Sequence, residues 1–265
     1  MSTSQNAVDD VLFDVCDGIA TVTLNRPERR NALSIAMAER LYALWETIDA
    51  DDAIQVAIIT AAHCGVFCAG MDLAEAAAVR RERDVDILDV LRDPFYERMG
   101  AIRKPVIAAL NGHFTAAGMV LALNADVRVG LAGTRAGIAE VRVGRGTPWA
   151  VPMLWMLPQA VLLEMLLTGE LLTVERLREV GFINTVEPTA DAVRQRARAL
   201  AQSIARNAPL SVRAAKAGLR LGAAHGAERG LAASKKLHEA VYASEDAREG
   251  PRAFAEKRTP VWKGR

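Results

Sequence analysis

The chain has 265 residues, of which 51% are hydrophobic and 25% charged, a profile typical of a globular protein with one large apolar core. Its 33 lysines and arginines nearly balance 32 acidic residues, so no overall charge attracts nucleic acid and any anion must be bound locally. No apolar run approaches the ~18 residues of a membrane-spanning helix, and the N-terminus lacks the basic and apolar regions of a signal peptide. We therefore expect a cytoplasmic protein that binds neither nucleic acid nor membranes.

The cysteines argue against a disulfide-stapled secreted domain. Cys16, Cys64 and Cys68 are an odd number without regular spacing. His63 stands beside Cys64, but no second cluster provides the remaining ligands of a zinc site. We expect no bound metal.

The first predicted element is a β-hairpin. Residues 12–15 and 19–24 have the apolar pattern of two short strands, and Asp17-Gly18 between them can form a turn with positive φ. After a turn-rich stretch, Ser34 can cap a helix whose apolar side chains recur at steps of three and four as far as Ile48. Because the opposite face of this helix is polar, we expect it to cover a sheet.

Three buried strands are predicted next, at residues 55–60, 104–110 and 126–130. Each is a continuous apolar run, which is typical of a parallel sheet with helices on both faces. The densely charged segment 79–98 is predicted to form a solvated helix or a mobile flap. Strands that alternate with helices indicate an α/β architecture with parallel crossovers.

From about residue 159 onward the pattern is almost entirely helical, and an all-helical C-terminal third should pack on, or reach past, the α/β core. The predicted helices span residues 160–167, 173–180, 191–206, 211–221, 227–243 and 244–256.

Several common sites are absent from the sequence. Gly144-Arg145-Gly146 lacks the third glycine and the preceding strand of a dinucleotide site. There is no Walker lysine pattern and no Gly-x-Ser-x-Gly elbow, which excludes P-loop nucleotide hydrolysis and serine esterase chemistry.

The most informative local feature is a strand that passes through Ala69-Gly70 into a helix start at Met71-Asp72. Glycine lets the backbone turn sharply, and the N–H of Met71 is then free at the beginning of the helix. Asp72 and Glu75, three residues apart, have the form of a capping box. We therefore interpret Asp72 as a cap and attach the functional hypothesis to the Met71 backbone.

Together with residues 104–112, which end in an Asn-Gly turn, residues 66–73 resemble segments of the crotonase superfamily, the enoyl-CoA hydratase/isomerase family. Residues 24–28 and 31–34 match the family's N-terminal strand and loop, so that the resemblance covers nearly the whole chain. It implies an α/β fold, a crotonase-like spiral of ββα units with a helical C-terminal region, and an acyl-CoA substrate. CoA would be part of the substrate thioester, with no separate cofactor.

The resemblance also implies how the chain is divided and assembled. We place the α/β spiral core at residues 1–200 and the helical region at residues 201–265, with a role in trimerisation and in completing the CoA site. The expected assembly is a homotrimer or a homohexamer. Phe254 and Lys257 correspond to residues that reach a CoA bound near a neighbouring subunit, where they could pack on adenine and neutralise phosphate.

By the same resemblance, the backbone N–H groups of Met71 and Ala117 form an oxyanion hole. A helix N-terminus offers free N–H groups and a partial positive charge, and removing one such donor typically raises the barrier by ~3 kcal/mol. Ala116 and Ala117 stand where the family usually has glycines. Alanine still donates its N–H, but it restricts φ and crowds the thioester.

Residues 136–144 resemble the family's acid/base segment and place Glu140 at the catalytic position. A carboxylate facing an apolar pocket has its pKa raised toward the working pH. Val120 occupies the position where hydratases of the family carry another catalytic glutamate. Since one carboxylate is sufficient to move a proton between carbons, we predict double-bond isomerisation through an oxyanion-stabilised enolate.

Two alternatives stay open: hydration with Glu140 in the absence of the usual second glutamate, and an inactive paralogue that binds acyl-CoA or acts as a scaffold. As secondary hypotheses, His113 could act as a base, and Arg142 and Arg145 could bind a carboxylate of the acyl group. The predicted substrate and CoA contacts are Ala32, Ala69, Gly70, Met71, Asp72, Leu73, His113, Ala116, Ala117, Phe254 and Lys257.

Overall fold

The chain opens with the predicted hairpin in the computed structural model, which describes residues 9–265. β1 (Val11–Cys16) pairs antiparallel with β2 (Ile19–Leu24). Asp17 and Gly18 connect them with φ values of 54° and 73°, the left-handed backbone that a tight hairpin turn requires. Both the strands and the turn predicted from the sequence are confirmed.

The hairpin forms one edge of a six-stranded sheet. From β2 onward all neighbours are parallel, with Val22 opposite Ile59 in the β2–β3 pair. All six residues of β3 are buried, as its uninterrupted apolar run predicts. The sheet has the order β1, β2, β3 (Val56–Ala61), β5 (Val106–Leu110), β7 (Val127–Leu131) and β10 (Thr185–Glu187).

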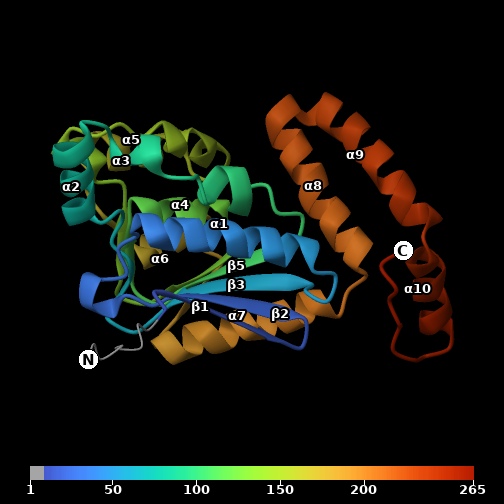
Figure 1. The fold of residues 1–265 in the computed structure, drawn as a ribbon. Helices are drawn as coiled ribbons and strands as arrows, with labels where there is room; N and C mark the ends of the chain where they lie inside the picture. The colour runs from blue at the N-terminus through green and yellow to red at the C-terminus, as the bar shows by residue number, and fades with distance from the viewer. Residues whose placement is uncertain (1–8) are drawn as a thin grey trace, which may run out of the picture.

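Helices cover both faces of this sheet (Figure 1). α1 (Ile35–Ala50) begins at Ser34, whose side chain accepts a hydrogen bond from the Met37 N–H at 3.2 Å, as the cap prediction requires. α7 (Ala190–Ala205) lies on the opposite face and buries Ala197 among strand residues such as Ile58. The predicted α/β layering is therefore present.

A second, four-stranded sheet was not expected from the sequence. Its members have two or three residues, too few to display a period of two. β4 precedes the Met71 loop and β6 precedes the Ala117 loop, and their parallel pairing places the two loops side by side. The strands are β4 (Val66–Cys68), β6 (His113–Thr115), β8 (Arg135–Gly137) and β9 (Leu172–Thr173).

The charged segment 79–98 is helical, as predicted, but it is broken into short pieces. α2 (Leu73–Arg83) ends at Asp84 in the left-handed conformation, and α3 (Ile87–Val90) and the π-helical turn η2 (Phe95–Met99) follow. We call residues 73–99 the flap, because they cover one side of the cavity described below.

From residue 159 onward the helical pattern predicted for the C-terminal third is confirmed, and only β9 and β10 interrupt it within the described residues. The elements not yet named include most of those helices. They are η1 (Pro27–Arg29), α4 (Ala117–Asn124), η3 (Glu140–Val143), η4 (Pro148–Trp155), α5 (Gln159–Thr168), α6 (Val174–Glu179), α8 (Pro209–His225), α9 (Ala227–Ala243) and α10 (Glu245–Ala255). Across residues 9–265, no helix has both the length and the apolar character needed to cross a membrane.

α8, α9 and α10 project from the sheet domain (Figure 1). α8 is attached to the core by Lys216, whose Nζ donates to the Asp126 carboxylate at 2.6 Å and to the Lys104 carbonyl at 2.7 Å. α7 packs on the sheet, so the projecting part starts with α8 at Pro209. The division at residues 200 and 201 stays a prediction.

A glycine contact lets α8 and α9 approach closely, and it generates a prediction. A Cβ on Gly230 would lie 2.4 Å from the Cα of Gly222, whereas a Cβ on Gly222 would meet nothing within 4 Å. Gly230→Ala should therefore lower the free energy of unfolding by about 1–3 kcal/mol. The matched Gly222→Ala should leave it unchanged or raise it by up to about 1 kcal/mol.

Guanidinium denaturation of both variants at one protein concentration measures the difference. Equal free energies of unfolding of the two variants would contradict the close approach of Gly230 to Gly222.

Candidate active site

The Gly70 loop after β4 and the start of α4 touch each other. Gly70 has a φ of +109°, and a Cβ at this position would lie 2.9 Å from the Ala116 Cβ and 3.9 Å from the Ala117 nitrogen. A Cβ on Gly118 would likewise lie 2.6 Å from the Cys68 carbonyl oxygen. Glycine at both positions is thus what allows the backbones to approach so closely.

Two backbone N–H groups at this contact have no hydrogen-bond acceptor within the described residues. The Leu33 N–H donates to the Gly70 carbonyl and the Asp72 N–H donates to the Leu33 carbonyl, both at 2.8 Å, which fixes the peptide between them. The Met71 N–H in that bridge has no acceptor within residues 9–265, and neither has the N–H of Ala117, the first residue of α4. The structure therefore brings the two predicted oxyanion donors together.

Asp72 caps α2 as predicted, but the capping box is incomplete. The Asp72 carboxylate accepts from the N–H groups of Ala74 at 3.0 Å and Glu75 at 3.2 Å, and it pairs with Arg26 at 2.9 Å. Although burial alone would raise the pKa of Asp72, these bonds hold it below its usual value. The predicted reciprocal bond from Glu75 is wrong, because that carboxylate instead accepts from the Ile35 N–H at 2.9 Å and caps α1.

A cavity of about 460 Å³ lies beside the two donors. Ala69, Gly70, Met71, Ala116 and Ala117 line one side of it, and side chains of the flap and of the loop after Glu140 line the rest. Apart from a few polar groups the lining is apolar, which suits the hydrocarbon part of an acyl chain.

Glu140, at the start of η3, lines this cavity. Its Oε2 is buried and has no hydrogen-bond partner in the described chain. Burial raises the pKa of the Glu140 carboxyl, while neighbouring backbone N–H groups, the Trp149 side chain and the charge of Arg145 counteract part of this rise. A carboxyl with an open, desolvated oxygen is suited to accept a proton.

Within residues 9–265, the cavity lining offers no second carboxylate with an unoccupied oxygen. Val120, on α4, lines the wall and is 5% exposed. Asp93 also lines the cavity, but its carboxylate accepts hydrogen bonds from the Phe95 N–H at 2.7 Å and the Tyr96 N–H at 3.1 Å. Among the lining residues of the described chain, Glu140 is the one carboxylate with an unoccupied oxygen.

Comparison with known proteins identifies the family. Residues 14–265 match the sequence model of the enoyl-CoA hydratase/isomerase family. The chain belongs to this family.

Relatives cover the chain almost end to end. It is 36% identical to (E)-benzylidenesuccinyl-CoA hydratase of Thauera aromatica over 96% of this chain and 99% of that protein. It is 36% identical to 2,3-dehydroadipyl-CoA hydratase of Escherichia coli over 93% of this chain and 96% of that protein. The crystal structure of an enoyl-CoA hydratase from Mycobacterium tuberculosis superposes with a TM-score of 0.87 at 34% identity, covering 97% and 99% of the two chains.

These findings confirm the predicted crotonase-like α/β fold. They also show that the chain is an enzyme of the enoyl-CoA hydratase/isomerase type that acts on an acyl-CoA, and the inactive paralogue considered above is set aside.

Two contacts at the cavity could not be found from the sequence. Tyr96 lines the cavity and donates its hydroxyl to the Trp149 carbonyl, and burial raises the pKa of Tyr96 to about 12. Arg145 also lines it and forms a two-point ion pair with Asp86 of the flap. The sequence gives little indication of these contacts, because Tyr96 and Asp86 lie in a charged segment that has the pattern of an ordinary solvated helix.

Some predicted contacts lie outside the cavity. His113 is exposed, and its Nδ1 accepts from the Arg135 N–H at 3.0 Å, so the structure does not support the predicted roles of His113 as base or substrate contact. Arg142 is also exposed and donates to the Thr168 carbonyl at 3.3 Å. Neither Ala32 nor Asp72 is among the lining residues.

The predicted CoA contacts of the last helix lie apart from the cavity of the same chain. Phe254 on α10 is 87% exposed, and Lys257 follows the helix end. Figure 1 shows α10 on the opposite side of the molecule from α2 and α3. Contact of Phe254 and Lys257 with a CoA bound to a neighbouring copy stays a prediction.

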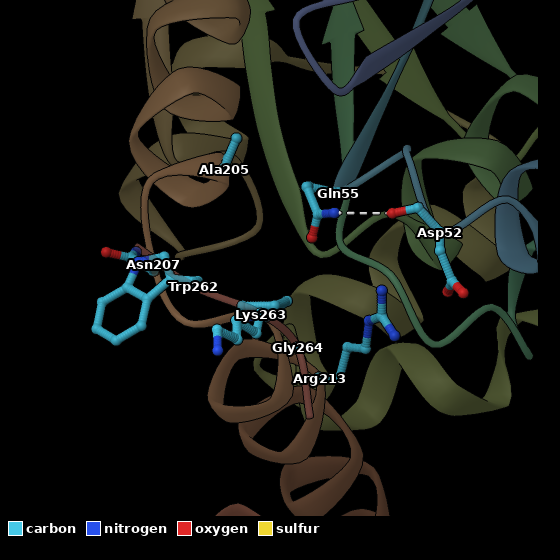
Figure 2. A pocket seen from close by; sticks show the side chains of 9 residues that line it. Asp52, Gln55, Ala205, Asn207, Arg213, Trp262, Lys263 and Gly264 are labelled. Carbon is cyan, nitrogen blue, oxygen red and sulfur yellow. Dashed lines mark hydrogen bonds between the residues drawn. The ribbon is translucent and has the colours of Figure 1, made fainter. Parts of the chain in front are cut away.

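A second cavity, of about 470 Å³, lies between the segment that carries Asp52 and the C-terminal residues (Figure 2). Gln55 donates to the Asp52 carbonyl at 3.0 Å, and Trp262 donates to the Arg206 carbonyl at 2.7 Å. We assign no chemistry to it, because the Trp262 bond holds the C-terminal segment in place and the Gln55 bond is local to its own loop. Within residues 9–265, no three His, Cys, Asp or Glu side chains are arranged to hold a metal ion.

The backbone at Ala116 is strained, and this generates a second prediction. Ala116 has φ 49° and ψ −117°, a combination that side chains other than glycine rarely adopt. Ala116→Gly should therefore raise the free energy of unfolding by about 1 kcal/mol, since relief of ~1–3 kcal/mol of strain exceeds the entropy that glycine adds to the unfolded chain.

The control is Ala122→Gly, inside α4, which should lower stability. Thermal or denaturant unfolding compares the two variants with the wild type. Destabilisation by Ala116→Gly to the same extent as by Ala122→Gly would show that Ala116 is not strained.

Proposed function

We propose that this enzyme isomerises the double bond of an enoyl-CoA thioester, with Glu140 as the single acid/base. One observation carries the proposal: Glu140 has a buried, unpartnered oxygen in the cavity, whereas Asp93 is occupied as a cap and Val120 stands where another carboxylate would be needed. One carboxylate is sufficient to carry a proton from one carbon to another.

In the proposed reaction, the thioester oxygen binds between the N–H groups of Met71 and Ala117. Glu140 removes a proton from the α carbon of a Δ3-enoyl group, and the charge passes to the thioester oxygen as a dienolate. The two donors stabilise this oxyanion, each by ~3 kcal/mol in comparable sites. Protonated Glu140 then returns the same proton to the γ carbon, which leaves the double bond conjugated and the atoms balanced.

The surroundings of Glu140 support this role. Burial raises its pKa, so the carboxylate is a stronger base than one in water. Leu91 and Phe95 of the flap and Pro148 line the cavity with apolar surface. Such a lining disfavours competing water and strengthens the interaction of the oxyanion with its two donors.

Hydration is the second candidate, and the names of the relatives favour it. The two proteins that are each 36% identical to this chain are named as hydratases. Here Glu140 alone would have to direct a water molecule to the β carbon and supply the proton to the α carbon. The apolar side chain of Val120, which also lines the cavity, could not hold that water.

The third prediction concerns the reaction itself. Wild-type enzyme should convert hex-3-enoyl-CoA to hex-2-enoyl-CoA, a product of unchanged mass, and Glu140→Gln should slow this by about 10²–10⁴-fold. Liquid chromatography with mass spectrometry follows both masses, since hydration adds one water and isomerisation adds none.

Glu164→Gln on the exposed side of α5 is the matched control and should retain wild-type turnover. Undiminished turnover by Glu140→Gln would remove Glu140 from the mechanism. A hydrated product from hex-2-enoyl-CoA, without isomerisation, would decide for the second candidate.

We also propose that the chain assembles as a trimer or a pair of trimers. Leu219, Tyr242 and Phe254 on the projecting helices are at least 77% exposed, and burying such large apolar side chains against another copy would be favourable. Native mass spectrometry should show three or six copies, and Phe254→Ala should raise the KM for acyl-CoA. A monomer with full activity would contradict the assembly, and an unchanged KM in Phe254→Ala would contradict the contact of Phe254 with CoA.

A further inference from the structure

We propose that the ion pair between Asp86 and Arg145 makes the acyl cavity select neutral, apolar acyl groups and reject acyl chains that carry a carboxylate. The inference rests on the proposed function only for the location of the acyl chain in this cavity. It concerns which acyl groups enter and is independent of whether the double bond is moved or hydrated.

The charges at the cavity are few. Within the described chain, Arg145 is the single cationic side chain of its lining, and Asp93 and Glu140 are its two carboxylates. An anionic group on the substrate would therefore depend on Arg145 for a partner. The body of the acyl chain would meet the apolar side chains of Leu73, Ile87, Leu88, Leu91, Phe95 and Val143.

Arg145 already holds a carboxylate. Its Nη1 and Nη2 donate to the two carboxylate oxygens of Asp86 at 2.5 and 2.9 Å, an arrangement that uses the end of the guanidinium fork. A backbone bond from the Arg145 N–H to the Glu140 carbonyl at 3.0 Å keeps the arginine beside the acid/base. The cation that an anionic acyl group needs is thus paired with a flap residue, although 40% of the Arg145 side chain stays exposed.

Hydrogen bonds within the flap hold the Asp86 carboxylate in the position from which it pairs with Arg145. Its Oδ1 accepts from the Leu88 N–H at 3.0 Å, and its own N–H donates to Asp89 at 3.2 Å, so that it caps α3. The bonds from Arg145 and Leu88 lower the pKa of Asp86 to about 2, so it is ionised at any pH at which the enzyme would be assayed. A substrate carboxylate would compete with a carboxylate that is anchored to the flap backbone.

The remaining charges add to the rejection. A carboxylate in this cavity would approach Asp93 and ionised Glu140, and like charges in a poorly hydrated cavity repel strongly. A neutral chain meets no such penalty, because the Asp86–Arg145 pair is internally balanced. Specificity therefore has two sources: Asp93 and Glu140 repel an acyl carboxylate, and Asp86 occupies Arg145, the one cation of the described lining.

The test removes the charge of Asp86 and keeps its shape. Asn also caps helices well, so Asp86→Asn should retain α3 while it releases Arg145. The matched ligands are hexanoyl-CoA and 5-carboxypentanoyl-CoA, which have six acyl carbons each and differ in the terminal carboxylate. Both are saturated, so titration calorimetry measures their Kd without turnover.

Wild-type enzyme should bind hexanoyl-CoA at least about tenfold more tightly than 5-carboxypentanoyl-CoA, and Asp86→Asn should shift this ratio by about tenfold or more toward the carboxylate ligand. Asp84→Asn is the matched control: it removes the same charge two residues away, at a side chain that is 93% exposed, and should leave the ratio unchanged. The kcat/KM values of the corresponding 3-enoyl thioesters should follow the same order.

Equal or tighter binding of the carboxylate ligand by wild-type enzyme would overturn the proposal and assign Arg145 as its receptor, which Arg145→Met would then abolish. Should Asp86→Asn fail to fold, Asp86→Ser, which also caps helices, replaces it. An unshifted ratio in the folded variant would likewise overturn the proposal. Selective binding without any turnover of either enoyl thioester would contradict the proposed function and leave this inference intact.

Discussion

The contact between the Gly70 loop and the start of α4 determines where both backbone donors lie. It depends on the short parallel pairing of β4 with β6 and on glycine at positions 70 and 118, where a Cβ would approach neighbouring atoms to 2.9 Å or less. The bridge from Leu33 then fixes the Met71 peptide, and the helix start fixes that of Ala117. Donors held in this way need no rearrangement when an oxyanion forms, which is the condition for strong stabilisation.

The cavity beside these donors differs from one that contains two acid/base carboxylates. Val120 leaves Glu140 without a partner, and Ala116 retains a left-handed backbone despite its Cβ. Both departures are local, since the fold is that of the family over nearly the whole chain. The family and the acyl-CoA substrate follow from the fold and motifs, whereas the reaction has to be argued from single side chains.

The sequence predicted the strands and helices that have long, regular apolar patterns, such as β3, α1 and α7. It could not predict β4, β6 and β8, because three residues are too few to show a strand period. Met71, Ala117 and Glu140 could be named from motifs, but the role of Glu75 in capping α1 and the pairing of Asp86 with Arg145 could not. These contacts join residues 40 and 59 positions apart, and local spacing carries no signal for them.

The central claim is that Met71, Ala117 and Glu140 together generate an enolate from a bound thioester. Hydrogen exchange at the α carbon of butyryl-CoA in heavy water tests it most directly, since a saturated acyl group can neither isomerise nor take up water. The account predicts that wild-type enzyme catalyses incorporation of deuterium, measured by mass spectrometry, and that Glu140→Gln does not. Exchange by Glu140→Gln at the wild-type rate, or no exchange by wild-type enzyme, would contradict it.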